Sequence, residues 1–467
     1  MMIPDVQDAV QAQRDSSTGD HTTDEHFTSS KDGLENVRHP SSSPLENLPV
    51  ELGTLLLSSM PDLPTLRALV YASPILYAQY RYSRNGILRA CLSRELDGFF
   101  IDAYASVMSR REHGDWTNEA ITSYLNTYKT WLSKSTPVPN IQTIDPSRIR
   151  YMVAFHMSVA RPMARLYSNW ALTNLKKAVI LSTYQQEDAE TDVDEVETEE
   201  EVAVDNHNIK LSRSEEIRFY RALYRYETYE HLFGRERGDG FFPEEIHDIF
   251  FYLFDPWEAE AVGCIEIFVR SKYVNIFHQA TRNLHPENDW FRHTPWETHG
   301  LEDDYDDFLE GSLFHSLEVI ARLLTIDNDE ALVSELQKNR SLSHYVDAPI
   351  KSALCTVAQF QRRQRSANFP DARDEAEKIR DPIQFIGDTV PPDGPPAAWV
   401  ALWGGRYSNI YGGYVPEPVQ QWGYVFWDEH RWIDMGVDDN LLVRQWKLSD
   451  DLVDEIESDY DWRPPEC

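Results

Sequence analysis

Residues 45–92 read LENLPVELGTLLLSSMPDLPTLRALVYASPILYAQYRYSRNGILRACL, and this stretch decides how the chain begins to fold. Pro49 suits the first turn of a helix, where its missing N–H costs no hydrogen bond. The leucines that follow recur at the spacing of one helix face, at Leu52, Leu55 and Leu56. We therefore expect a short amphipathic helix to begin near residue 49.

Two further helix starts follow within the same stretch. Pro61 ends the first pattern, and Asp62 with Pro64 can cap and open a second helix. Ser73-Pro74 is a third start signal, a capping hydroxyl followed by a proline at the first helical position. The apolar spacing of the first helix recurs in the second, at Leu66, Leu69 and Val70. Three helices this short bury little between themselves, so they need a partner surface or the rest of the chain.

These three helices resemble the F-box, a module that docks onto the Skp adaptor of cullin–RING ubiquitin ligases. The matching segments are Leu48-Pro49-x-Glu51-Leu52 and Leu66-x-x-Leu69-Val70. The longer pattern LPxEL…MPDLPTLRALVYASPILYAQY, with the later stretch RFYRALYRYETYEHLFG, is similar to a group of F-box-like proteins from filamentous fungi. The resemblance implies that apolar residues of the first two helices face the adaptor, and these are Leu48, Pro49, Leu52, Leu56, Leu66 and Leu69.

The chain departs from the family pattern at one place. Ala72-Ser73-Pro74-Ile75 stands where many F-boxes carry a Cys-Arg-Arg-Trp-like segment, so the end of the adaptor-binding surface is not defined. The alternative is a stand-alone helical binding or structural protein whose first helices belong to its own core. That alternative predicts that the leucines of these helices are covered by later helices of the same chain.

Composition narrows the classes of partner. The chain has 467 residues, of which 41% are hydrophobic, as in a globular protein of one to three domains. Its net charge of −34 disfavours non-specific binding to nucleic acid or to an anionic membrane. The four cysteines are far apart and the N-terminus has no basic or apolar targeting pattern, so we expect a cytoplasmic or nuclear protein without membrane spans.

The fold that we expect is mainly α, in four parts. Residues 1–43 are polar and predict a disordered tail. Residues 45–92 are the F-box-like helices, and 93–390 form a large, irregular helical body interrupted at about 185–208 by an acidic, disordered loop. Residues 391–467 follow a proline-rich turn and are dense in Trp, Tyr and Gly, which favours short strands or ordered loops.

Within the body, several helices are predicted by their ends. Ser212-Arg213-Ser214-Glu215 fits a capping box, with Gly234 placed to end the helix. Asp255-Pro256-Trp257-Glu258 is another start. Apolar spacing predicts further helices over 87–111, 119–133, 151–181, 305–324, 330–338 and 348–363. Aromatic residues crowd the helix that begins after Ser212, a pattern more typical of a core face than of a ligand site.

No motif predicts chemistry. Phosphate-loop, dinucleotide, zincin and hydrolase-elbow patterns do not occur, so we expect neither an enzyme nor a cofactor. His285, Asp289, His293, His299, Asp303 and Asp304 are of metal-ligand types, but their prolines and spacing favour a polar connecting loop. Asp428-Glu429-His430 is a weaker cluster of the same kind. The aromatic C-terminal region has two interpretations, a recognition surface or a cover for the core.

Overall fold

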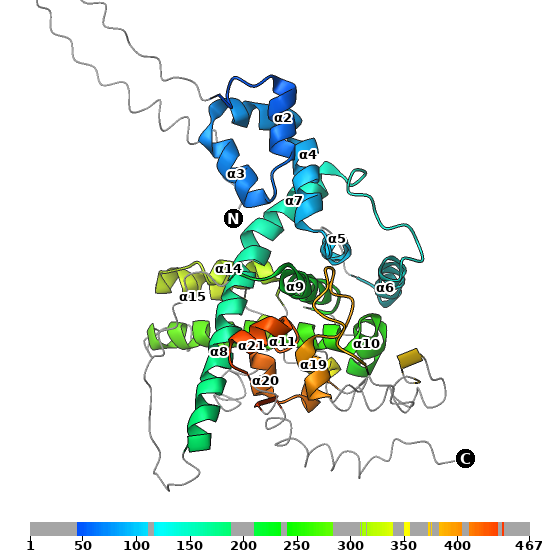
Figure 1. Cartoon of the computed structure of the whole chain (residues 1–467), viewed down its shortest axis with the longest axis vertical. Helices are drawn as coiled ribbons and strands as arrows, with labels where there is room; N and C mark the ends of the chain where they lie inside the picture. The colour runs from blue at the N-terminus through cyan, green and yellow to red at the C-terminus, as the bar shows by residue number, and fades with distance from the viewer. Residues whose placement is uncertain are drawn as a thin grey trace, which may run out of the picture.

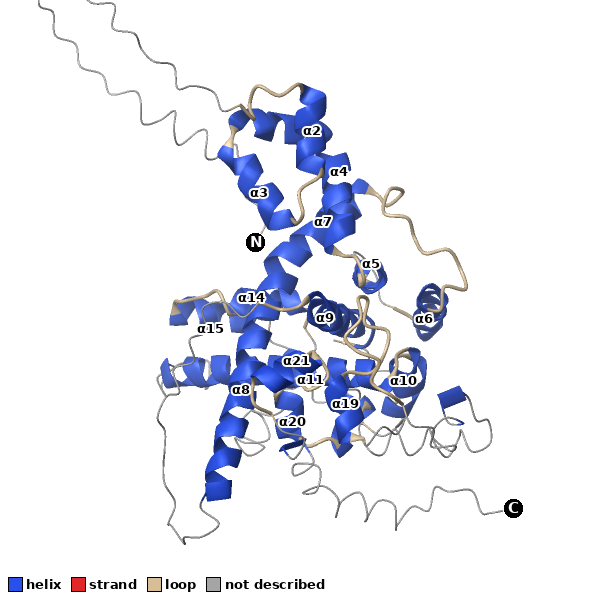
Figure 2. Cartoon of the chain, viewed as in Figure 1, coloured by secondary structure: helices blue, strands red, loops and turns tan. Residues whose placement is uncertain are grey.

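The structure is a computed structural model, and it describes residues 44–110, 116–187, 210–234, 241–283, 315–339, 350–354, 383–403 and 411–437, with single positions at 309, 311–313, 372–373, 375 and 441–442. Within these residues every regular element is a helix, and no strand occurs (Figure 2). The mainly α prediction is confirmed. The predicted tail 1–43, the acidic run from residue 188 and the polar loop 285–304 lie outside the described residues.

The first three helices begin where the sequence predicts them. They are α2 (Val50–Ser58), α3 (Leu63–Ala72) and α4 (Pro74–Glu95), called here the N-terminal helices. Asp62 caps α3 by accepting from the Thr65 N–H at 2.7 Å, and Ser73 caps α4 by accepting from the Leu76 N–H at 3.3 Å. Both α2 and α3 pack against α4, at one end of the molecule (Figure 1).

The helix predicted over 87–111 is two helices. α4 ends at Glu95 and α5 (Phe100–Ser109) starts after a turn at Gly98, whose φ is +90°. Glycine is required there because φ is positive and because a Cβ would meet the Ile217 side chain at 2.5 Å. The turn lets α5 lie along α9 (Arg213–Phe233).

A long rod runs from the N-terminal helices through the body (Figure 1). It consists of α7 (Pro146–Phe155), a π turn (η1, His156–Ala160) and α8 (Arg161–Glu187). The π turn directly precedes Pro162, which has no N–H to give to the preceding turn of an α-helix. The helical rod therefore continues through Pro162.

α9 is the central helix of the body. Ser212 and Glu215 form the predicted capping box, and Gly234 occupies the C-cap position. Nearly every residue of α9 is buried, because α5 covers one side and α11 (Pro256–Asn283) covers another. The interpretation of its aromatic residues as core is therefore confirmed.

The helix predicted over 305–324 is interrupted at Ser316. α14 (Leu317–Leu323) starts there, and Ser316 caps it by accepting from the Glu318 N–H at 3.2 Å. The remaining described helices of the body are α6 (Asn118–Leu132), α10 (Pro243–Ile249), η3 (Phe251–Leu253), α15 (Asp329–Lys338) and α16 (Ile350–Ala353). None of the helices in the described residues is long and apolar enough to cross a membrane.

The C-terminal region is made of short helices where we expected short strands or loops. They are α19 (Ala397–Leu402), η4 (Gly412–Tyr414), α20 (Glu417–Gln421) and α21 (Glu429–Asp434). Their aromatic rings are buried in the same core as the N-terminal helices and the body, at Trp399, Tyr411, Trp422, Tyr424, Trp427 and Trp432. These rings cover the core, and the interpretation as a recognition surface does not hold for them.

Candidate functional site

Several exposed aliphatic side chains lie on the short helix α2. Val50, Leu52 and Leu55 are 53%, 49% and 64% exposed. Leu45, just before the helix, is 44% exposed. Single exposed leucines are ordinary, but a run of them on one short helix indicates a surface that binds something. We call Leu52 and Leu55, which are three residues apart and therefore lie on one side of the helix, the α2 face.

The six residues that the resemblance implies for adaptor binding lie at different depths. Pro49 and Leu52 are exposed, and Leu48, Leu56 and Leu69 are partly exposed. Leu66 is 3% exposed and packs inside the chain, so in this structure its role is to support the neighbouring surface.

Within residues 45–92, six large exposed apolar residues lie outside that set. They are Leu45, Val50, Leu55, Tyr71, Ile75 and Tyr82, with exposures of 44%, 53%, 64%, 61%, 42% and 86%. Leu55 shares the spacing of the first leucine stripe, and that spacing was the signal that could have added it. Tyr71 and Ile75 carry no such signal, because they flank the junction between two helices.

α4 holds α2 in place from behind. Gly53 is buried against Gln79, and a Cβ at residue 53 would overlap the Gln79 amide oxygen at 1.8 Å. Arg94 donates from its guanidinium to the Ser58 carbonyl at 2.5 Å and from Nε to the Met60 carbonyl at 3.1 Å. These bonds satisfy carbonyls at the C-terminal end of α2, where a helix leaves acceptors without partners. The α2 face is thus presented on a fixed support.

A single carboxylate connects the N-terminal helices to the body. Glu95, at the end of α4, accepts from the Leu63 N–H at 3.0 Å and from His156 Nε2 at 3.1 Å, and it pairs with Arg161. His156 continues the chain of contacts to α9, because its Nδ1 lies 2.9 Å from the Tyr224 hydroxyl. Three helices and the rod therefore meet at Glu95.

The charges at Glu95 follow from these contacts. Burial alone would raise the pKa of Glu95, but the His156 and Leu63 donors and the Arg161 charge outweigh it and hold the pKa at about 2. Burial lowers the pKa of His156 in spite of the nearby carboxylate, so the ring is neutral at pH 7. A carboxylate only accepts, which places the ring proton on Nε2 and leaves Nδ1 to accept from Tyr224.

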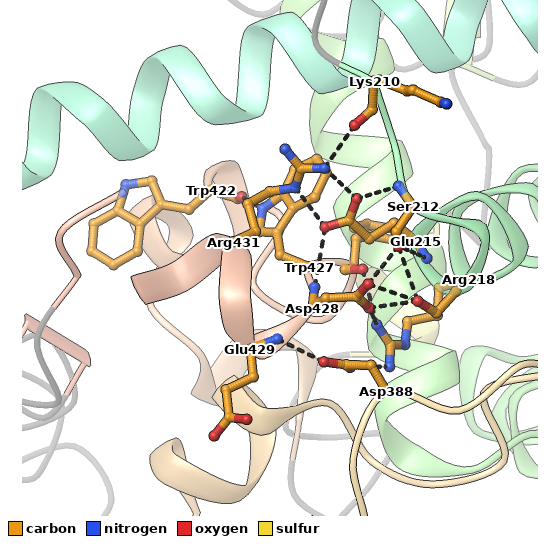
Figure 3. Close-up of polar contacts among 12 residues, drawn as sticks. Lys210, Ser212, Glu215, Arg218, Asp388, Trp422, Trp427, Asp428, Glu429 and Arg431 are labelled. Carbon is orange, nitrogen blue, oxygen red and sulfur yellow. Dashed lines mark hydrogen bonds and ion pairs between the residues drawn. The ribbon is translucent and has the colours of Figure 1, made fainter. Parts of the chain in front are cut away.

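A second polar cluster joins the C-terminal region to the N-terminus of α9 (Figure 3). Asp428 accepts from the Ser212 hydroxyl, from Ser214 Oγ at 2.7 Å and from Arg218 Nη1 at 2.7 Å. The other guanidinium nitrogen of Arg218 donates to Asp388 at 2.8 Å. Burial raises the pKa of Asp428, but the serine donors and Arg218 outweigh it and lower the pKa below its ordinary value.

The capping-box glutamate belongs to the same cluster. Glu215 is fully buried and accepts from the Ser212 N–H at 2.9 Å, as a capping box requires. The same carboxylate receives Arg431 of α21 through two donors, Nε and Nη2, each at 2.5 Å (Figure 3). We call the three ion pairs Arg431–Glu215, Arg218–Asp428 and Arg218–Asp388 the C-terminal latch.

Asp388, Asp428 and His430 bring ligand-type atoms within 4.8 Å of one another, which raises the question of a metal site. The donors around the carboxylates answer it. The Arg218 guanidinium already lies between Asp388 and Asp428, and Asp388 also accepts from the Glu429 N–H at 2.8 Å. A cation bound there would have to displace or oppose the arginine, so the arrangement serves to fasten the C-terminal region.

Glu260 on α11 fastens the same region from the other side. Its carboxylate is fully buried and accepts from the Gly412 N–H at 2.7 Å and from Gln420 Nε2 at 2.6 Å. Burial raises the pKa of Glu260 to about 7, against the effect of these two donors. In the described residues, the buried polar groups near the C-terminal region hold it in place, whereas the α2 face has no such internal use.

Comparison of the chain with protein-family models, with curated proteins and with solved structures finds no match.

Proposed function

We propose that the chain is an F-box-like interaction adaptor whose N-terminal helices dock onto the Skp-type adaptor of a cullin–RING ubiquitin ligase. The proposal rests on the α2 face, where Leu52 is 49% exposed and Leu55 is 64% exposed on a helix supported from behind by α4. The helical body would hold a protein substrate, in the cytoplasm or the nucleus. The chain would supply proximity between substrate and ubiquitin-loaded enzyme and would need no catalytic group of its own.

The burial of the leucines favours this proposal over the alternative of a stand-alone helical protein. If the first helices belonged only to the chain's own core, later helices would cover Leu52, Leu56, Leu66 and Leu69. Leu66 is buried, as that alternative predicts, but Leu52 is half exposed and Leu56 and Leu69 are partly exposed.

The direct test replaces two leucines of the α2 face. We expect Leu52→Asp with Leu55→Asp to weaken capture of the Skp-type adaptor, measured by co-purification and by titration calorimetry. Burial of the exposed half of each leucine contributes about 1 kcal/mol, so losing both lowers affinity by roughly 30-fold. The fold is unaffected because both positions are exposed.

The matched control carries the same two changes far from the N-terminal helices. Ile386→Asp with Ile433→Asp replaces one residue just before the C-terminal region and one within it, which are 64% and 68% exposed. This control keeps full adaptor binding. Undiminished binding by the α2 variant contradicts the proposed docking face, and a folded wild-type chain that captures no adaptor supports the stand-alone alternative.

A further inference from the structure

The helices α3 and α4 carry an unusual charge balance for this chain. Residues 63–94 contain five arginines and no Asp, Glu or Lys, whereas the whole chain has 78 acidic against 44 basic residues. Two of the five serve inside the fold, since Arg89 donates to the Ile144 carbonyl at 2.6 Å and Arg94 holds the end of α2. The other three are exposed, at Arg67, Arg81 and Arg84.

Each of these three arginines lies over a tyrosine one helical turn away. The guanidinium carbon is 5.6 Å from the ring centre in the pair Arg67–Tyr71, 6.0 Å in Arg81–Tyr77 and 5.9 Å in Arg84–Tyr80. The spacing of four residues places such pairs on one helix face. We call these six residues the Arg–Tyr face.

The pairs on the two helices are neighbours. α3 packs against α4, and Ser73 alone separates their ends. Burial raises the pKa of Tyr80, Arg84 lowers it, and Tyr71 of the other helix adds to the rise. The Arg67–Tyr71 pair and the Arg84–Tyr80 pair therefore lie on two helices that pack against each other, at one end of the molecule (Figure 1).

Carboxylates near this surface are used elsewhere. Glu46 accepts from the Ser73 hydroxyl at 2.6 Å, Asp62 caps α3, and Glu95 is buried at the junction with the body. In the part of the chain that the structure describes, neither Arg67 nor Arg84 forms an ion pair.

We propose that the Arg–Tyr face binds an acidic segment of a partner protein. Each guanidinium lies within about 6 Å of a tyrosine ring centre, and Arg81 also donates to the Tyr77 hydroxyl at 3.4 Å. A guanidinium has five N–H donors, so others stay available for the two oxygens of a carboxylate. Contact with the tyrosine also restrains the long arginine side chain before binding, which reduces the entropy lost on association. The α2 face supplies apolar contact and the Arg–Tyr face supplies charge, so the two surfaces are independent.

A nucleic acid is the other polyanion that such a face could suggest, and the geometry argues against it. Base stacking needs an open aromatic ring. Tyr77 and Tyr80 are partly buried, and each tyrosine of the face, including the exposed Tyr71, already has an arginine over it. A long polyanion would also extend past the three arginines onto the rest of this protein, whose net charge of −34 would repel it. A short acidic peptide avoids that repulsion.

The test measures binding of labelled peptides to the full chain by fluorescence anisotropy. We expect a labelled oligoglutamate peptide to bind, with affinity that falls as salt is added, and an oligoglutamine peptide not to bind. Arg67→Ala with Arg84→Ala raises the Kd for oligoglutamate at least about tenfold, because two charge-assisted pairs are lost.

The control variant changes net charge equally but elsewhere. Arg165→Ala with Lys177→Ala removes two exposed positive charges from α8, and its Kd stays near that of the wild type. An equal loss in both variants, or equal binding of oligoglutamine, overturns the proposal. Tighter binding of a labelled oligothymidylate than of oligoglutamate also overturns it and favours nucleic acid. Leu52→Ser with Leu55→Ser keeps oligoglutamate binding, which separates this result from a failure of the adaptor proposal.

Discussion

At the scale of single residues, Glu95 shows how one buried carboxylate can fix the position of a surface. It receives a donor from Leu63 of α3 and two from the rod, at His156 and Arg161, so the helices that carry the α2 face are tied to the body through it. We predict that Glu95→Gln lowers the free energy of unfolding by about 2–4 kcal/mol, because the amide removes the charge that His156 and Arg161 were arranged to meet. Urea denaturation measures this loss.

The control for that substitution is a carboxylate of the same type at the surface. Glu216 pairs with Arg213 and its side chain is 37% exposed. Glu216→Gln changes the free energy of unfolding by less than about 0.5 kcal/mol, since exposed ion pairs contribute little. Equal losses for the two variants are incompatible with a special role for Glu95.

The depressed pKa of Glu95 adds a pH dependence. The folded value is about 2, below the ordinary value of 4.5, so the folded state binds this proton less readily than the unfolded state. Its contribution to stability is therefore complete above pH 4.5 and is lost as the pH falls towards 2. The difference in unfolding free energy between wild type and Glu95→Gln should be largest near about pH 6 and smaller near about pH 3. A constant difference over that range rules out this account.

At the scale of elements, the N-terminus of α9 anchors the C-terminal region. Arg218 bridges Asp388 and Asp428, whose side chains are 15% and 3% exposed. We predict that Arg218→Met releases the C-terminal latch, because it leaves two carboxylates buried without their cation at a cost of about 3–5 kcal/mol. Hydrogen exchange should then accelerate in residues 423–437 by at least about tenfold, while the amides of α4 change less.

Arg322→Met is the matched control for that experiment. Arg322 of α14 pairs with Glu335 of α15, but the Arg322 side chain is 49% exposed. Its loss leaves hydrogen exchange in the C-terminal region as in the wild type. A uniform acceleration throughout the Arg218→Met protein would mean that the residue supports the whole core and not the latch.

At the scale of the whole molecule, the sequence predicted those features that depend on neighbours along the chain. Asp62, Ser73 and the Ser212–Glu215 capping box are local signals, and each marks a helix start in the structure. The break at Ser316 could not be predicted in this way, because its hydroxyl bonds to Glu227, 89 residues earlier. In the same way, nothing in the capping box indicates that Glu215 also receives Arg431.

The candidate surfaces follow the same division. The leucine stripe indicated Leu52 and Leu56, but only the packing of α2 against α4 decides that Leu52 is exposed and Leu57 is buried. In the Arg–Tyr face each arginine lies four residues from its tyrosine, which is a local spacing. Only tertiary packing brings the α3 pair beside the α4 pairs, and the sequence does not indicate that packing.

The structure differs most from the sequence-based prediction in the C-terminal region, and this difference leads to a prediction for the whole chain. Its aromatic residues belong to one buried cluster that also includes Leu57 of α2 and Tyr167 of the rod. Tyr167 contacts Phe426 with ring centres 5.1 Å apart, and Gly423 lies against its hydroxyl. A chain ending at residue 390 would thus expose the surface that Trp399, Tyr424 and Trp427 cover.

We predict that this truncated chain does not unfold cooperatively and binds hydrophobic dyes, because losing one buried tryptophan alone costs about 3–5 kcal/mol and the cut removes several. Adding residues 391–467 as a separate fragment should restore part of the cooperative transition, since the latch and Glu260 provide specific contacts for it. Near-ultraviolet circular dichroism and urea unfolding measure both effects. If the unfolding free energy of the truncated chain falls with urea concentration as steeply as that of the intact protein, the C-terminal region is an independent unit and not the cover of a shared core.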